Sequence, residues 1–290
     1  MALTAEHDSL GIAALDGAFG AAVAGVDLGG TLADAEFATI RDAFLASQIL
    51  VFRGQQLDKP AQIRFTERFG ELELPLNRDY LGADYPALHV VTNLDTEGRL
   101  KDRKVLANPG NYFWHTDASY MAVPAMATLL YAVQVPPAGG DTAFANLHLA
   151  YEALPETTKA RIDGMKAVHS WAQSRINSGS RPATEEEARS APPVAHPLVR
   201  THPDTGRKAL YLGNHTSHIE GLPVEEGRAL LGELLAHATA PRFVYRHRWQ
   251  PGDLVMWDNR CLVHRASDDF DFTTHARVLH RTVLRGTVPV

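Results

Sequence analysis

Turn-forming sequences divide the second half of this chain into short apolar runs. The PDTG segment at 203–206 separates two strand-like runs, 197–201 and 209–212, and PGD at 251–253 precedes another at 254–257. Short runs bounded by Gly, Pro and Asp are typical of β-strands joined by tight turns. With a further run at 277–284, the pattern predicts a β-sandwich or jelly roll.

The first half combines this β pattern with helices. Apolar residues at Ala33, Phe37, Ile40 and Phe44 recur at helical spacing and predict an amphipathic helix over 31–47. Similar patterns predict helices at 59–69 and 224–238, a helical region at 146–165, a mobile loop at 178–193, and strands at 49–52, 89–93, 127–135 and 243–249. We therefore expect a mostly β jelly roll decorated with helices, forming one domain over 1–290 with a helical and loop insertion at about 146–195.

Composition excludes several classes of partner. The net charge of -6 and the pI near 6.1 give no support for nucleic-acid binding. The single cysteine, Cys261, cannot form an intramolecular disulfide, which favours a reducing compartment. The first ten residues do not form a secretory signal, and no apolar run reaches the roughly 18 residues of a membrane helix. We expect a cytoplasmic protein without a membrane partner; a homo-oligomer stays open.

Three His-x-Asp/Glu pairs are candidate metal ligands. Chance predicts about 1.6 such pairs for this composition, so the pattern alone is weak. His202 lies beside a proline in a turn that we expect to face solvent, and His218 lies in a loop, so both are expected to be surface residues. His115 and Asp117 would point to one side of an extended strand and could bind one ion together.

The neighbours of His115 and Asp117 carry a family resemblance. The run WHTDASY at 114–120 is followed by GGDT at 139–142, by WDNRCLVH at 257–264, and by Arg277 and Arg281. In order and approximate spacing this resembles the taurine/2,4-dichlorophenoxyacetate dioxygenase family over residues 10–286. The resemblance implies a double-stranded β-helix that binds Fe(II) through His115, Asp117 and His264.

The same resemblance implies a co-substrate site. Thr142 and Arg277 match residues that bind the distal carboxylate of 2-oxoglutarate, and Arg281 matches a residue that meets the anionic end of the substrate. The spacing from His264 to Arg277 is slightly longer than is common in the family, because residues 268–274 include a small insertion. Arg277 and Arg281 nevertheless keep a four-residue spacing, which puts both on one face of a strand. Arg285 continues the series as a weaker competitor.

The implied chemistry is hydroxylation. A two-histidine, one-carboxylate site leaves positions open on iron for 2-oxoglutarate and O2. In the family, decarboxylation of 2-oxoglutarate to succinate and carbon dioxide supplies the oxidant that hydroxylates a C–H bond. Related halogenases replace the carboxylate ligand by a small residue, whereas Asp117 is present here, which favours hydroxylation.

The substrate is expected to be a small acid. The segments at 197–207, 217–223 and 243–249 resemble the aryloxyacetate branch, whose members release a phenol and glyoxylate. Arg281 would bind the carboxylate, with Arg78 and Asn111 as further substrate-binding candidates. A taurine-type alkylsulfonate dioxygenase, a non-oxidative jelly-roll metalloprotein and an inactive 2-oxoglutarate sensor are the alternatives. His215 is expected to have a structural or surface role, and Cys261 to be a small buried apolar residue.

Overall fold

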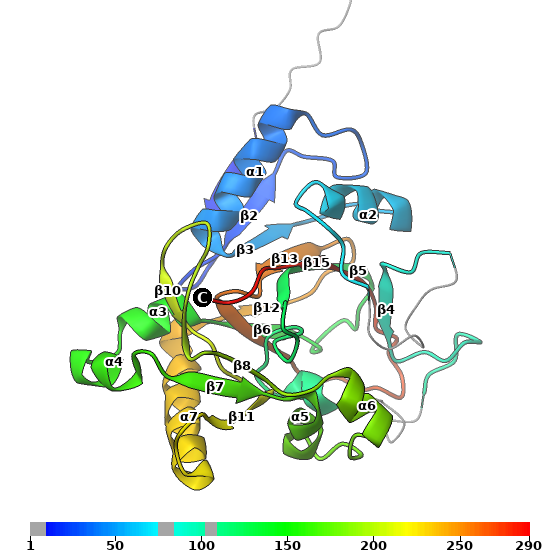
Figure 1. Cartoon of the computed structure of the whole chain (residues 1–290). Helices are drawn as coiled ribbons and strands as arrows, with labels where there is room; N and C mark the ends of the chain where they lie inside the picture. Colours follow the sequence, from blue (N-terminus) through cyan, green and yellow to red (C-terminus); the bar gives the residue numbers. More distant parts are fainter. Residues whose placement is uncertain (1–9, 75–83, 102–108) are drawn as a thin grey trace, which may run out of the picture.

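A seven-stranded sheet lies at the centre of the computed structural model, which describes residues 10–74, 84–101 and 109–290 (Figure 1). Neighbouring strands are antiparallel except β2 and β3, which run parallel. The sheet places strands from the two ends of the chain side by side, such as the third and the thirteenth. Their order is β1 (Gly11–Ala14), β2 (Ala21–Ala24), β3 (Ile49–Phe52), β13 (Leu254–Asp258), β5 (Ala125–Gln134), β15 (Val278–Arg285) and β4 (His89–Thr92).

Smaller sheets accompany the large one in the described part of the chain. One has the order β12-β6-β14, with β12 (Val244–His247), β6 (Thr142–Asn146) and β14 (Leu262–Ala266). Another has the order β11-β7-β8, with β11 (Thr216–Ile219), β7 (Lys166–His169) and β8 (Val194–Pro197). A two-stranded pair joins β10 (Lys208–Leu210) to β9 (Val199–Thr201).

Alternation along the strands of the large sheet divides the interior into two cores. Leu50 and Phe52 of β3 pack on one side with residues of α1 (Asp34–Ser47) and α2 (Lys59–Glu67). Ile49 and Val51 face the other side, where Phe144 of β6 belongs to the same cluster. Because successive side chains of a strand point to opposite faces, each strand contributes to both cores. The cluster with Ile49 and Val51 is the inner core, and the other is the outer core. The metal-binding candidates line a cavity on the inner side, to which strands of both sheets contribute.

The other helices pack beside the smaller sheets. α7 (Val224–Ala238) buries Leu230 and Leu234 in the inner core together with Leu147 of α3 (Leu147–Glu152). The remaining helices are α4 (Glu156–Ile162), α5 (Trp171–Asn177) and α6 (Glu185–Ser190), with 3-10 turns η3 (Pro109–Tyr112) and η4 (Pro241–Phe243). The fold is thus mixed α/β. No helix in the described ranges has the length and apolar character needed to cross a membrane.

Most predicted elements are present, and the prediction of a loop at 178–193 is wrong. The helical region predicted at 146–165 consists of two helices, α3 and α4, and β7 begins after it at Lys166. The expected loop at 178–193 contains α6, whose first turn is capped by hydrogen bonds between Thr184 and Glu187. Residues 146–195 therefore include β7 as well as helices and loops, and their being an insertion stays a prediction.

Candidate metal centre and active site

His115 and His264 lie directly opposite each other across a backbone bridge. Each donates its amide N–H to the carbonyl of the other, at 3.0 and 2.7 Å. His264 belongs to β14, but the expected strand at 115–117 is wrong: His115 forms an isolated bridge, and Asp117 begins a turn in which Ala118 has φ +54°. The absence of a side chain at Gly213 lets its backbone lie against Trp114 and His115, since a Cβ there would be 3.0 Å from the carbonyl oxygen of Trp114.

The three side chains converge on one point. Oδ1 of Asp117 lies 4.0 Å from Nε2 of His115 and 4.0 Å from Nε2 of His264. Nδ1 of His115 lies 2.8 Å from the carbonyl oxygen of Phe113, which assigns the proton to Nδ1 and leaves the Nε2 lone pair facing the site. Each side chain is nearly buried. Metal bonds are about 2.0–2.2 Å long, so one ion can bridge atoms at these separations.

The electrostatics of the three groups suit a divalent cation. Burial lowers the pKa of His115 and lowers that of His264 much further, so both imidazoles are neutral. Burial alone would raise the pKa of Asp117, but the Arg281 guanidinium and the hydrogen bond from the Thr128 hydroxyl hold it well below its usual range. Two neutral imidazoles and a carboxylate are the protonation states that metal binding requires.

Hydrogen bonds fix the orientation of Asp117. The Thr128 hydroxyl on β5 donates to Oδ2 at 2.6 Å, and Asn259 Nδ2 donates to that hydroxyl at 2.9 Å. Trp257 Nε1 in turn donates to Asn259 Oδ1 at 3.0 Å. These bonds occupy one carboxylate oxygen and leave Oδ1 facing the imidazoles. Sequence reasoning missed Thr128, which lies in an apolar run; Asn259, within the WDN motif, offered a signal.

Arg281 lies beside the metal ligands. Its guanidinium is 2.8 Å from Oδ1 of Asp117, the oxygen that faces both imidazoles. Arg277 directly precedes β15, four residues before Arg281, and is partly buried. No acidic side chain of the described residues pairs with it, and its Nε has no hydrogen-bond partner. Burial lowers the pKa of Arg277 to about 10, so the guanidinium remains a cation at neutral pH without a counter-ion.

Thr142 stands in the same cavity wall as Arg277. Its Oγ1 accepts a hydrogen bond from Trp249 Nε1 at 3.0 Å, so its own hydrogen is available to another acceptor. The cavity has a volume of about 760 Å³, within the usual range for small-molecule sites. It brings together the predicted residues that the structure describes: His115, Asp117, His264, Thr142, Arg277, Arg281 and Asn111. Arg78 lies outside the described residues.

Comparison with known proteins identifies the family. The model of the family described as "Taurine catabolism dioxygenase TauD, TfdA family" matches residues 11–283. The chain belongs to the TauD/TfdA dioxygenase family. It is therefore an α-ketoglutarate-dependent dioxygenase, α-ketoglutarate being 2-oxoglutarate, and His115, Asp117 and His264 form its metal site.

Several relatives of this TauD/TfdA dioxygenase are named for aryloxy acids. The chain is 42% identical to the α-ketoglutarate-dependent 2,4-dichlorophenoxyacetate dioxygenase of Burkholderia sp. strain RASC, over 89% of this chain and 88% of the relative. It is 37% identical to the (S)-phenoxypropionate/α-ketoglutarate dioxygenase of Sphingobium herbicidovorans, over 94% of each. The crystal structure of AAD-2 with Mn(II) and N-oxalylglycine superposes with a TM-score of 0.87 at 38% identity, covering 97% of this chain and 98% of that one.

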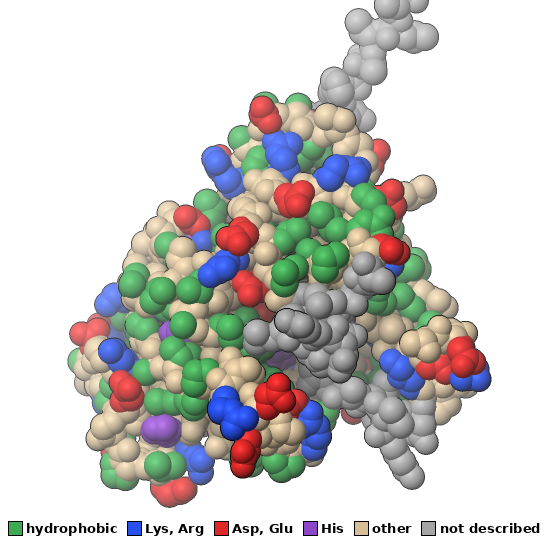
Figure 2. Space-filling view, turned by 45° about the vertical axis from the view of Figure 1, so that its right-hand side comes forward, with side chains coloured by type: hydrophobic (Ala, Val, Ile, Leu, Met, Phe, Trp, Pro, Cys, Tyr) green, Lys and Arg blue, Asp and Glu red, His purple; other side chains and the backbone are tan. Residues whose placement is uncertain are grey.

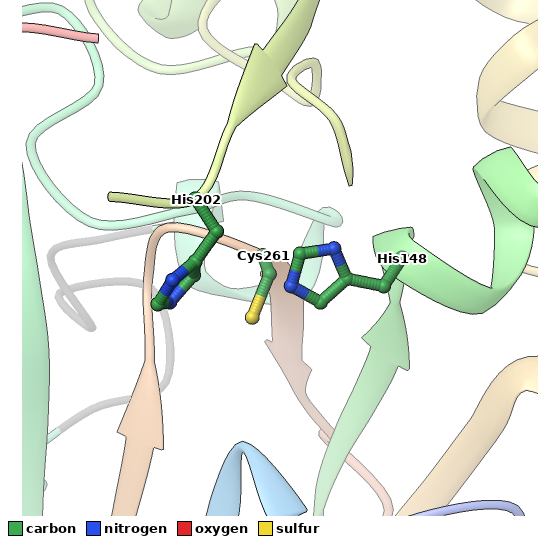
Figure 3. A group of neighbouring side chains, drawn as sticks. All are labelled: His148, His202 and Cys261. Carbon is green, nitrogen blue, oxygen red and sulfur yellow. The ribbon is translucent and has the colours of Figure 1, made fainter. Parts of the chain in front are cut away.

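The dioxygenase also buries a second His/Cys group, shown in Figure 3. His148 of α3, His202 after β9 and Cys261 between β13 and β14 point toward one another. The ring nitrogens of His202 are already engaged: Nε2 bonds Asp258 Oδ2 at 3.0 Å, and Nδ1 accepts from the amides of Asp204 and Thr205. This group is therefore part of a structural hydrogen-bond network.

The expectation that His202 faces solvent is wrong. The residue is only 2% exposed, because its ring contacts the buried Asp258, which also forms an ion pair with Arg260. His218 lies in β11, not in a loop, and does not line the cavity. His215 does line it, with Nδ1 3.1 Å from the Ser119 hydroxyl, and burial lowers its pKa to about 3.

The surface of the dioxygenase shows mixed charge. On the face in Figure 2, acidic and basic side chains are interspersed among hydrophobic ones and form no continuous basic patch. This distribution agrees with the net charge of -6. The basic groups that bear on function are Arg277 and Arg281, inside the cavity.

Proposed function

We propose that this dioxygenase uses Fe(II) to hydroxylate an aryloxyalkanoate-like acid at the carbon between the ether oxygen and the carboxylate. The observation that carries the proposal is the pair of guanidinium groups in one cavity with the metal site. Arg277 lines the cavity with Thr142 and has no acidic partner among the described residues, and Arg281 reaches Asp117. Two anions, the co-substrate and the substrate, would satisfy these two cations.

Iron is the metal that suits the donor set. His115, Asp117 and His264 would hold it and leave further positions open, which is the ligand pattern of non-haem Fe(II) oxygenases. Mn(II) in the AAD-2 structure is also a divalent ion. When bound, Fe(II) with 2-oxoglutarate and O2 supplies the oxidising chemistry. The protein's own contribution is to bind, orient and shield the reactants.

Arg277 and Thr142 would bind the distal carboxylate of 2-oxoglutarate. The fork of a guanidinium matches a carboxylate and gives short, charge-assisted hydrogen bonds. The Asn93 side chain accepts from the amide of Arg277 at 2.8 Å and fixes the start of β15. Trp249 orients the Thr142 hydroxyl, so both donors are positioned before the co-substrate arrives.

Arg281 would bind the carboxylate of the primary substrate. A metal ion competes with Arg281 for Oδ1 of Asp117, because the two cations need the same oxygen. Metal binding would thus release the guanidinium toward an incoming anion while keeping it beside the reacting centre. Asn111 of η3, in the cavity wall, could add a hydrogen bond. Arg78 stays a predicted substrate residue.

The proposed reaction balances as two steps. One substrate C–H becomes C–OH while 2-oxoglutarate and O2 give succinate and carbon dioxide, with one oxygen atom entering succinate and the other the hydroxyl group. The product is a hemiacetal. The bond between the hydroxylated carbon and the ether oxygen breaks, the oxygen leaves with the ring as a phenolate that takes up the hydroxyl proton, and a phenol and glyoxylate, or a related keto acid, are released.

We also propose that the chain is one domain with the jelly-roll architecture of a double-stranded β-helix. The seven-stranded sheet and the β12-β6-β14 sheet would be its two walls, with the metal site between them. The pairing of β14 with β6, and of β13 and β15 with β5, supports this arrangement.

A substrate panel tests the function. Phenoxyacetates, phenoxypropionates and alkanesulfonates are incubated with Fe(II), 2-oxoglutarate and O2, and succinate and phenol are measured together. We expect phenol in step with succinate for the aryloxy acids. Turnover of taurine or another sulfonate, with no aryloxy acid oxidised, would reject the aryloxyalkanoate assignment in favour of an alkylsulfonate dioxygenase, since Arg281 could bind either anion.

A further inference from the structure

Glu73 is an acidic residue in the wall of the active-site cavity that the proposed reaction does not use. It lies at the end of a short segment that runs antiparallel to β15. The amide of Glu73 donates to the carbonyl of Val283 at 2.8 Å, the amide of Arg285 donates to the carbonyl of Glu71 at 2.8 Å, and Leu72 bridges Leu284. These bonds fix its register beside the strand that carries Arg281.

The register places Glu73 on the same face of β15 as Arg281. Leu284 packs in the outer core, so Leu72 opposite it also faces outward. Side chains alternate along a strand, so Glu73 and Val283 face inward with Arg281. All three line the cavity. Because diagonal neighbours across an antiparallel pair lie roughly 7–8 Å apart, the backbones at Glu73 and Arg281 are separated by about the length of one substituted benzene ring.

The carboxylate of Glu73 forms no hydrogen bond or ion pair with the described residues. The Arg285 guanidinium attracts this carboxylate and lowers its pKa, but its ion pair, at 3.8 Å, is with Glu71. The other acidic residues in the cavity wall are engaged, Asp117 in the metal site and Glu187 with Arg181 at 2.6 Å. Burial raises the pKa of Glu73, which indicates that its charge is incompletely solvated and would be stabilised by a donor.

We propose that Glu73 selects acids that carry an ammonium group at the end remote from the carboxylate. Arg281 would bind the anionic end and Glu73 the cationic end, so the cavity favours a zwitterion over an acid with an apolar end. The inference rests on the proposed function for the placement of the acid at Arg281. A second anionic group at the remote end would be repelled by Glu73, and an apolar one would leave the carboxylate unpaired.

Two substrates of nearly equal shape test the selection. 4-(Aminomethyl)phenoxyacetate and 4-ethylphenoxyacetate differ in having an ammonium or a methyl group at the same place. We expect the wild-type enzyme to favour the ammonium acid by about tenfold or more in kcat/KM, as for a hydrogen bond between charged groups. Glu73→Gln should remove most of that preference. Glu71→Gln, the same change on an exposed neighbour outside the cavity wall, should keep it.

Equilibrium binding separates this inference from the proposed function. Kd is measured by calorimetry for the same pair, and for 4-aminobutanesulfonate and pentanesulfonate, on anaerobic protein loaded with Fe(II) and 2-oxoglutarate. A Glu73-dependent preference for the ammonium sulfonate, without oxidation of either aryloxy acid, keeps the inference and rejects the aryloxyalkanoate function. The inference is overturned if the wild type binds both ammonium acids no more tightly than their methyl counterparts. It is also overturned if folded Glu73→Gln keeps the wild-type preference, even if phenol is formed.

Discussion

The role of a side chain in this dioxygenase can depend on a partner that is distant in the sequence. The motif that resembles the family was sufficient to predict His115, Asp117 and His264, because their type and order are visible in the sequence. His202 carried a similar motif, yet its role depends on Asp258, 56 residues away. A proline and a turn signal beside His202 indicate local backbone shape but not burial, so the sequence could not separate a surface histidine from a buried one.

Arg277 and Thr142 should contribute unequally to co-substrate binding. Arg277→Ala removes a charge-assisted pair worth about 1.5–3 kcal/mol and should raise the Kd of 2-oxoglutarate at least about tenfold. Thr142→Ala removes one neutral donor and should cost about 1 kcal/mol. Anaerobic titration of 2-oxoglutarate into the Fe(II)-loaded protein measures both.

Arg281→Ala is the matched control for that titration, since it removes the same charge from the same strand face. Its Kd for 2-oxoglutarate should stay near that of the wild type, while the substrate KM rises. If Arg281→Ala weakened 2-oxoglutarate binding more than Arg277→Ala does, Arg281 would be the co-substrate residue and Arg277 the substrate residue.

The strands show where local patterns predict structure and where they do not. β5 and β15 were predictable because long β-branched and apolar runs need little context. β6 was not predicted, since Thr142–Asn146 contains two alanines and follows two glycines; it is a strand because β12 and β14 pair with both of its edges. The function of Thr128 was hidden for a similar reason, because only the fold brings Asp117 to that position on β5.

Two buried threonines on neighbouring strands test this role of β5. Thr128→Val keeps the shape but removes the hydroxyl that donates to Asp117, so metal affinity and turnover should fall, by about 1.5–3 kcal/mol for a hydrogen bond to a charged group. Thr282→Val on β15 removes a hydroxyl that bonds Thr66 of α2, on the outer side of the sheet. It should lower the free energy of unfolding and leave metal affinity unchanged. Calorimetric metal titration, with thermal unfolding of both variants, distinguishes them; equal metal affinities would reject the role of Thr128.

The buried histidines couple the stability of the whole protein to pH. Burial lowers the pKa of His148 to about 4 and that of His215 to about 3, and it lowers the pKa of His169 well below 6.5. The unfolded chain takes up protons at these residues as the pH falls through about 6.5, whereas the folded chain does so only near its lower pKa values. The unfolded state therefore binds more protons in this window, and stability decreases as the pH is lowered.

Each such histidine adds a slope of at most about 1.4 kcal/mol per pH unit between its two pKa values. Several together should produce a steep fall in the free energy of unfolding of the metal-free protein between pH 6.5 and about 4. Replacing His148 by Gln removes one titrating group and should make the slope shallower. It also removes the bond from Nδ1 to the Lys208 carbonyl, so stability at pH 7 should decrease as well. Urea unfolding at a series of pH values measures the slope, and a free energy that does not change across this window would contradict neutral buried imidazoles in the folded protein.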